Sequence, residues 1–102
     1  MSNSVTYGEL KQQRLKDPEY AEGYLEAALG MYYEDRDNKA FLSALRDIAI
    51  AQQGMSTLAK NIGKNRQSLY KALSPAGNPT FETLSEVLSS LGYKFDIVKT
   101  AS

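Results

Sequence analysis

The stretch that decides the fold is MSTLAKNIGKNRQSLYKAL, residues 55–73. Its apolar residues recur every three or four positions on either side of Gly63, which predicts two short helices joined by a tight turn. Glycine suits the left-handed conformation that commonly ends a helix, and Asn65 can cap the helix that follows. The expected core positions are Leu58, Ala59, Ile62, Leu69, Ala72 and Leu73. The stretch therefore predicts a helix-turn-helix motif.

The same part of the chain is positively charged. Residues 55–81 contain no Asp or Glu, although they contain the four basic residues Lys60, Lys64, Arg66 and Lys71. Charges on a helix surface often indicate nothing more than contact with solvent. The complete absence of carboxylates from the motif favours contact with DNA over that simpler interpretation.

The outward positions of the second helix predict how DNA would be read. Arg and Gln side chains can form two hydrogen bonds with the edges of guanine and adenine, whereas Lys and hydroxyl groups suit phosphate oxygens. The predicted base-reading residues are Arg66, Gln67, Ser68 and Tyr70. The predicted phosphate contacts are Lys64, Lys71, Asn78 and Thr80. Turn formation and helix capping would explain the last two nearly as well.

Composition limits the other classes of function. The 102 residues suit one small domain, with little room for an enclosed active site. The chain has no Cys and no His, so it lacks thiolate metal ligands and the commonest general base. We therefore expect neither an enzyme nor a metal or other cofactor. No signal segment or long apolar run is found, which favours a cytoplasmic protein without membrane contact.

The rest of the chain predicts three more helices. Asp17 followed by Pro18 is typical of a helix start, and apolar spacing extends that helix to about residue 34. A strongly apolar helix is expected over residues 39–53. The final helix, residues 81–91, should bury the stripe Phe81, Leu84, Val87, Leu88 and Leu91. Residues 1–16 are expected to form a flexible arm, and residues 17–102 a single domain.

The amino-terminal half has the opposite charge from the motif. Residues 1–54 hold six Lys and Arg against nine Asp and Glu, whereas residues 55–102 hold six against three. This asymmetry predicts two surfaces with different partners. Four tyrosines in the acidic half are candidates for contact with a protein partner: Tyr20, Tyr24, Tyr32 and Tyr33. The alternative is that these rings border the core, and for Tyr24 we favour it.

The carboxyl-terminal residues 93–98 alternate between apolar and polar, a pattern typical of a strand. A single strand has unpaired edges, and the same strand of a second copy could pair with it. This predicts a homodimer, which would match a palindromic DNA site. The alternative is a tail that packs over its own helices.

The order and spacing of LAKNIGKNRQSLYKAL and NPTFETLSEVLSSLG resemble the Xre/Cro-type helix-turn-helix family. Within that family, three stretches resemble the addiction-module antidote proteins: LKDPEYAEGYLEAAL, FLSALRDIAIAQQGMSTLAKNIG and RQSLYKALSPAGNPTFETL. Together the similarity covers residues 15–98. It implies an all-α, five-helix, lambda-repressor-like DNA-binding domain with a short C-terminal β-strand.

The resemblance also implies a function. It indicates an antitoxin encoded beside a small RelE/HigB-like toxin, which the antitoxin neutralises while repressing its own operon on double-stranded DNA. A stand-alone phage-type transcriptional regulator without a toxin is the alternative. Two positions depart from the wider family, since Lys64 stands where an apolar residue is usual and Met55 where Gln often contacts phosphate. Either the Lys64 stem passes along the turn or the turn is more open than usual, and we expect Met55 to pack.

Overall fold

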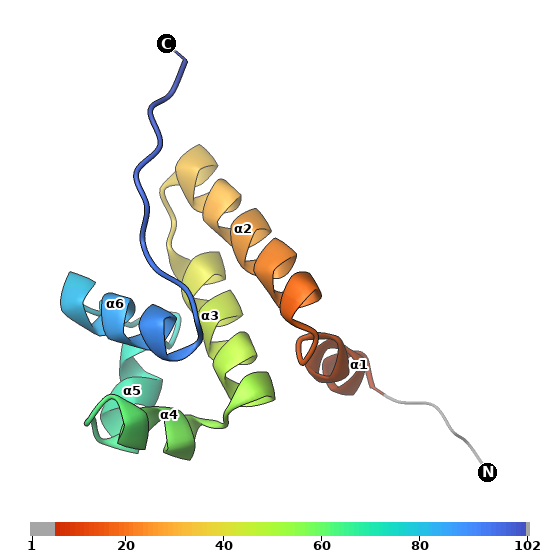
Figure 1. The fold of residues 1–102 in the computed structure, drawn as a ribbon, viewed down its shortest axis with the longest axis vertical. Coiled ribbons are helices and arrows are strands. Elements are labelled where there is room, and N and C mark those ends of the chain that lie inside the picture. The colour runs from red at the N-terminus through yellow and green to blue at the C-terminus, as the bar shows by residue number, and fades with distance from the viewer. Residues whose placement is uncertain (1–5, 102) are drawn as a thin grey trace.

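The computed structural model describes residues 6–101, which fold as six α-helices without a strand (Figure 1). The helices are α1 (Tyr7–Arg14), α2 (Pro18–Asp35), α3 (Lys39–Gln52), α4 (Met55–Asn61), α5 (Arg66–Ala72) and α6 (Phe81–Ser90). The all-α prediction is therefore confirmed for this part of the chain. The predicted count of five helices and the predicted C-terminal strand are wrong.

Local hydrogen bonds explain where the helices begin. The Asp17 carboxylate accepts a hydrogen bond from the backbone N–H of Glu19 (3.2 Å) at the start of α2, and Pro18 occupies the first helical position. The hydroxyl oxygen of Thr80 accepts from the backbone N–H of Thr83 (3.1 Å) at the start of α6. These two starts lie where the sequence predicts them.

Helix α3 occupies the centre of the molecule and contacts α1, α2 and α4, while α4 contacts α5 and α6 (Figure 1). One side of α3 supplies much of the core, namely Phe41, Leu42, Ala44, Leu45, Ile48 and Ala49. Within residues 6–101 no polar or charged side chain is buried, so the hydrophobic effect provides most of the packing energy. The apolar stripe of α3 therefore holds the two halves of the domain together.

Helix α1 lies in the segment that we expected to be a flexible arm. Its first turn is closed by a capping box, in which the Thr6 hydroxyl accepts from Glu9 N–H and the Glu9 carboxylate accepts from Thr6 N–H. No residue of α1 is buried, but Leu15, directly after it, is fully buried. Residues 1–5 of the expected arm lie outside the described residues.

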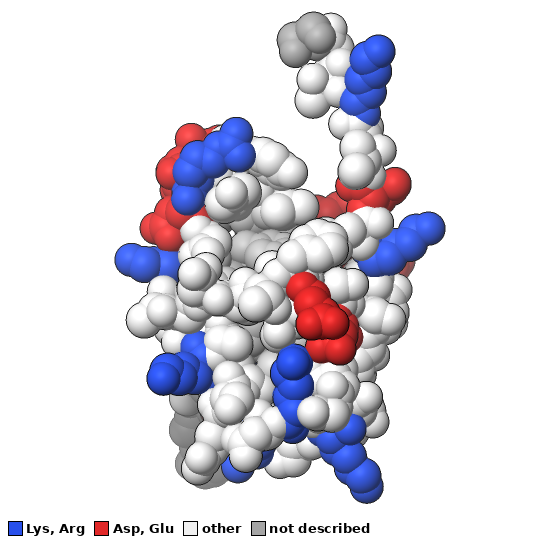
Figure 2. Space-filling model, turned by 90° about the vertical axis from the view of Figure 1, so that its left-hand side faces the viewer, with Lys and Arg blue, Asp and Glu red and all other residues white. Residues whose placement is uncertain are grey.

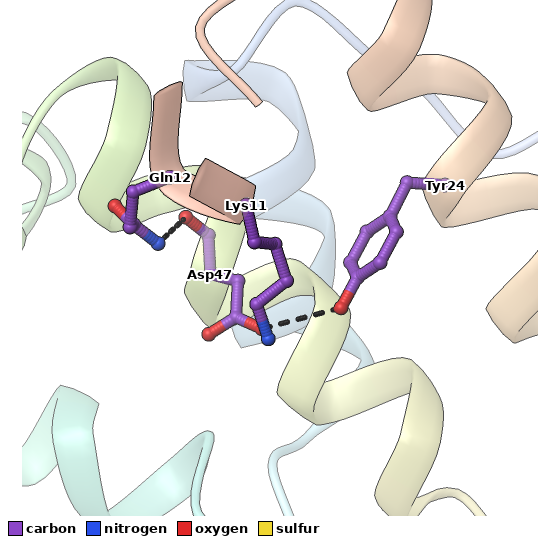
Figure 3. A network of polar contacts seen from close by, with 4 residues as sticks. All are labelled: Lys11, Gln12, Tyr24 and Asp47. Carbon is purple, nitrogen blue, oxygen red and sulfur yellow. Dashed lines mark hydrogen bonds and ion pairs between the residues drawn. The ribbon is translucent and has the colours of Figure 1, made fainter. Parts of the chain in front are cut away.

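A network of polar contacts holds α1 against α2 and α3 (Figure 3). Nζ of Lys11 and the Tyr24 hydroxyl lie 3.1 and 3.3 Å from the same Asp47 carboxylate oxygen, Oδ2. The Gln12 side-chain amide donates to the Asp47 backbone carbonyl (3.3 Å). Hydrogen bonding to Asp47 raises the pKa of Lys11, and burial raises the pKa of Tyr24. Asp47 is therefore the centre of the contact between these helices.

The carboxyl-terminal residues 93–101 leave α6 as an irregular tail that rises along the molecule in Figure 1. The described residues 6–101 offer the tail no neighbouring strand with which to form a ladder, so the predicted strand does not form. Phe81 was expected in the buried stripe of α6 but is 71% exposed, because it begins the helix and stacks on Phe95 of the tail, with ring centroids 4.8 Å apart. The remaining stripe residues are buried or partly buried in the core.

Candidate nucleic-acid interface

The turn between α4 and α5 fixes the direction of α5. Gly63 has a positive φ of 69°, and its N–H donates to the Lys60 carbonyl (3.3 Å), while Lys64 N–H donates to the Ala59 carbonyl (2.9 Å). This pair of bonds is the Schellman arrangement, in which glycine adopts the left-handed conformation at little cost. The Asn65 side chain then accepts from Gln67 N–H (2.8 Å) and Ser68 N–H (3.1 Å) to start α5. The predicted turn and cap are both present.

Helix α5 has one buried side and one exposed side. Leu69 lies within α5 and Leu73 directly after it, and both are buried in the core together with Leu58 and Ala59 of α4. The exposed residues are Arg66, Gln67, Ser68 and Lys71. Three of the four predicted base-reading residues therefore lie on one short exposed surface, with the predicted phosphate contact Lys71 one turn further along.

Tyr70, the fourth predicted base-reading residue, is half-buried and packs against the core. The Arg66 guanidinium lies over its ring, 5.3 Å from the centroid. This cation–π contact restricts the Arg66 side chain without removing it from solvent. The Tyr70 ring therefore lies beneath the Arg66 side chain, and only part of the ring is exposed at the surface.

Lys64 is half-buried and lies close to Glu86, a carboxylate outside the acid-free residues 55–81. Its Nζ lies 3.7 Å from Oε1 of Glu86 on α6, an oxygen with no hydrogen-bond partner. Figure 2 shows the surrounding face, over α4, α5 and α6, where Lys and Arg side chains spread over the lower part and a small acidic cluster lies among them. The local charge at Lys64 is therefore smaller than the sequence of the motif alone indicates.

The turn after α5 contains the other two predicted phosphate contacts. Asn78 and Thr80 are both exposed, but the Thr80 hydroxyl already caps α6. Gly77 lies close to the end of α5, where a Cβ atom would clash with the backbone carbonyl oxygens of Ala72 and Lys71. Only glycine fits there, so this turn packs directly against the last residues of the candidate DNA-reading helix.

The four tyrosines predicted to contact a partner have different environments. Tyr33 is largely exposed and Tyr20 less so, while Tyr32 is half-buried. The Arg36 side chain lies over the rings of Tyr32 and Tyr33, 5.5 Å from each centroid. Tyr24 borders the core and donates to Asp47, which agrees with the alternative that we favoured for this ring.

In residues 6–101 no three Asp or Glu side chains come together as potential metal ligands. None of the helices in the same range is both long and apolar enough to cross a membrane.

Residues 10–99 match the family described as "Probable addiction module antidote protein". The chain belongs to this antidote family. A relative from Haemophilus influenzae (strain ATCC 51907 / DSM 11121 / KW20 / Rd), titled "Uncharacterized protein", is 41% identical over 90 residues, which cover 83% of this chain and 92% of the relative. No solved structure matches this chain.

Sequence reasoning missed the residues that connect α1 to the rest of this antidote-family protein. Lys11 and Gln12 lie in the expected arm, and their partner Asp47 lies on α3, far along the chain. The one available signal was Thr6 followed three residues later by Glu9, which is the spacing of a capping box. Glu86 was missed because its distance to Lys64 depends on how α6 packs, which local patterns do not reveal.

Proposed function

We propose that this protein is a sequence-specific DNA-binding antitoxin of a type II toxin–antitoxin module. In this role it neutralises a small RelE/HigB-like toxin and represses its own operon. Membership of the antidote family over residues 10–99 supports the antitoxin part, because an antidote requires a toxin to act on. The exposed side of α5 supports DNA binding.

One observation carries the DNA-binding part of the proposal: α5 exposes Arg66, Gln67, Ser68 and Lys71 while its opposite side is anchored in the core. An Xre/Cro-type recognition helix needs this division, because base edges are read by side chains on a firmly held helix. The contact with Tyr70 restricts Arg66 before DNA arrives, which reduces the conformational entropy lost on binding. Arg66 and Gln67 would read bases, and Lys71 would bind phosphate.

The proposal includes a homodimer formed through the carboxyl-terminal tail. Ile97 and Val98 are both strongly exposed, and the backbone around them forms neither a helix nor a strand. Pairing with the same segment of a second copy would form a two-stranded ladder and cover these apolar side chains. Two recognition helices related by a two-fold axis suit DNA half-sites one helical turn apart.

The DNA-binding part is tested by a gel-shift assay on the DNA directly upstream of the gene for this chain, with a scrambled duplex of equal length as control. We expect binding to the upstream DNA to be at least about a thousandfold tighter than to the control, and to weaken as salt rises. Equal affinity for the two duplexes would contradict sequence-specific binding.

The antitoxin part is tested separately by co-expression with the small protein encoded next to this chain. A toxic neighbour that is silenced and co-purifies with this chain would support the proposal. A nontoxic neighbour that does not associate, together with specific DNA binding, would favour the stand-alone regulator instead. Family membership makes the first result the expected one.

A further inference from the structure

Helix α2 has a long surface that the described part of the chain does not cover. Only Ala21, Leu25 and Ala28 of its 18 residues are buried, and their spacing of four and three places them on one narrow stripe. Four large hydrophobic side chains outside this stripe are exposed: Tyr20, Leu29, Met31 and Tyr33 are 40%, 39%, 53% and 63% exposed. Figure 1 shows the carboxyl-terminal end of α2 extending past the start of α3.

One flank of α2 combines apolar and acidic groups in order. Glu22, Glu26, Leu29 and Tyr33 follow one another at spacings of four, three and four residues. At 3.6 residues per turn they fall within an arc of about 60°, so they form one continuous row. Their row begins with two carboxylates and ends with an aliphatic and an aromatic side chain. An apolar centre beside a charged rim is the usual composition of a protein-binding surface.

The charge of the helix restricts what can bind there. Residues 18–35 contain five carboxylates and no Lys or Arg. A nucleic acid or an anionic membrane would be repelled by this charge. A second copy of this helix would carry the same negative charge, so its approach to this surface is also unfavourable. Charge complementarity therefore selects a positively charged protein.

We propose that Leu29 and Tyr33, with Glu22 and Glu26 beside them, form the surface of α2 on which a basic toxin docks. The proposal rests on the antitoxin function proposed above, and it identifies the surface that performs it. Tyr24 is excluded from this surface, because its hydroxyl is bound to Asp47 inside the domain. Tyr33 is held beside Tyr32 by Arg36, so its ring is partly ordered before the toxin arrives.

The test measures the affinity of purified full-length chains for the small protein encoded next to this chain. Leu29→Ala and Tyr33→Ala should each weaken the complex about tenfold or more, as expected for apolar residues at the centre of an interface. Met31→Ala is the matched control, because Met31 is similarly exposed but points to the other flank of the helix. It should change the affinity less than about twofold.

Glu22 and Glu26 are tested separately, through the rate of association. Glu22→Gln with Glu26→Gln should slow association and reduce its dependence on salt, since rim charges act mainly on the encounter rate. The far-UV circular dichroism and the DNA affinity of each variant establish that the fold is intact.

Each result has a defined meaning. If the unaltered chain does not bind its neighbour at all, both the docking surface and the antitoxin function are overturned. If the unaltered chain binds and the Leu29 and Tyr33 variants bind equally well, the docking surface is overturned while the antitoxin function stands. If these variants instead lose self-association in sedimentation experiments, the surface belongs to a homodimer and the proposal is overturned. Selective loss of neighbour binding supports it.

Discussion

Two lysines on the candidate DNA-binding face differ in their surroundings. Lys71 is exposed on α5, whereas Lys64 is half-buried and 3.7 Å from the Glu86 carboxylate. A partly exposed ion pair contributes little to stability, about 0–1 kcal/mol, but it neutralises charge that would otherwise act on phosphate. Identical residue types can therefore contribute unequally to DNA binding.

Lys71→Ala should weaken binding to specific and random DNA alike and reduce the slope of log affinity against log salt by about one. Lys64→Ala should change this slope less, because Glu86 already balances its charge. Gel shifts over a salt series measure both slopes. Equal slopes for the two variants would show that the Glu86 pair does not persist when DNA binds.

Arg66 and Gln67 are predicted to affect specificity more than total affinity. Arg66→Ala or Gln67→Ala should cost about 1–3 kcal/mol on the upstream DNA, because a pair of hydrogen bonds to one base is lost. Binding to random duplex should weaken much less. Competition assays with both duplexes give the ratio of affinities for the upstream and random DNA. Losses of the same size on both would argue against base reading by that residue.

Two glycines should respond in opposite ways to the same substitution. Gly77→Ala should lower the free energy of unfolding by about 1–3 kcal/mol, because the added Cβ meets the backbone carbonyls of Ala72 and Lys71. Gly23→Ala should raise it by about 0.5–1 kcal/mol, because Gly23 lies within α2 and nothing is within 4 Å of its added Cβ. Urea unfolding at pH 7 measures both; a gain for Gly77→Ala would be incompatible with the tight turn.

At the scale of the element, regular apolar spacing made most helices predictable. The starts of α2, α5 and α6 and the turn at Gly63 follow from capping and glycine signals that act within a few residues. Helix α1 could not be found from apolar spacing, because none of its residues is buried and its attachment depends on contacts with the distant Asp47. Phe81 was misplaced because the first turn of α6 faces the tail instead of the core.

The attachment of α1 predicts a dependence of stability on pH. The raised pKa of Lys11 means that its contribution is complete below the ordinary lysine value of 10.5 and is lost as pH rises through the raised value. Burial also raises the pKa of Tyr24 above its ordinary value of 10.0, so its contribution to stability likewise falls as pH rises above that value. Lys11→Met should therefore cost about 0.5–1 kcal/mol at pH 7.5 and progressively less above pH 10.5.

Thermal or urea unfolding of the unaltered chain and of Lys11→Met between pH 7.5 and pH 11 would measure the difference in their free energies of unfolding. Lys16→Met, which alters an exposed lysine near the same helix, serves as the control and should cost little at any pH. A constant difference between the unaltered chain and Lys11→Met across the whole range would contradict the role assigned to the Asp47 pair.

At the scale of the whole molecule, the sequence predicts a strand that the isolated chain does not form. The alternation in residues 93–98 is real, but a strand requires a partner, and nothing in residues 6–101 provides one. Likewise, the exposed residues of α5 could be predicted from spacing, whereas the pairing of Lys64 with Glu86 depends on packing between helices distant in sequence. Local sequence patterns therefore identify which residues are exposed, whereas strand pairing and ion pairs depend on contacts between segments distant in sequence.

The proposed dimer can be tested at Ile97, which is 94% exposed. Ile97→Asp should leave the stability of the single chain within about 0.5 kcal/mol, since a surface change removes no core contact. It should shift the dimer towards monomer in sedimentation velocity and weaken binding to DNA with two half-sites. Lys99→Gln in the same tail is the control. An unchanged dimer with Ile97→Asp would rule out association through the tail.

The absence of tyrosine from the buried core has a practical consequence. The chain has seven tyrosines and no tryptophan, and all seven rings lie at least partly at the surface, among them Tyr33 on α2 and Tyr70 on α5. Near-ultraviolet emission of the unlabelled protein therefore includes contributions from Tyr33 and Tyr70, which lie on the two faces proposed to meet its partners. Quenching at Tyr70 by stacked bases, or a change at Tyr33 on complex formation, would provide separate optical signals once single Tyr→Phe variants have assigned each one.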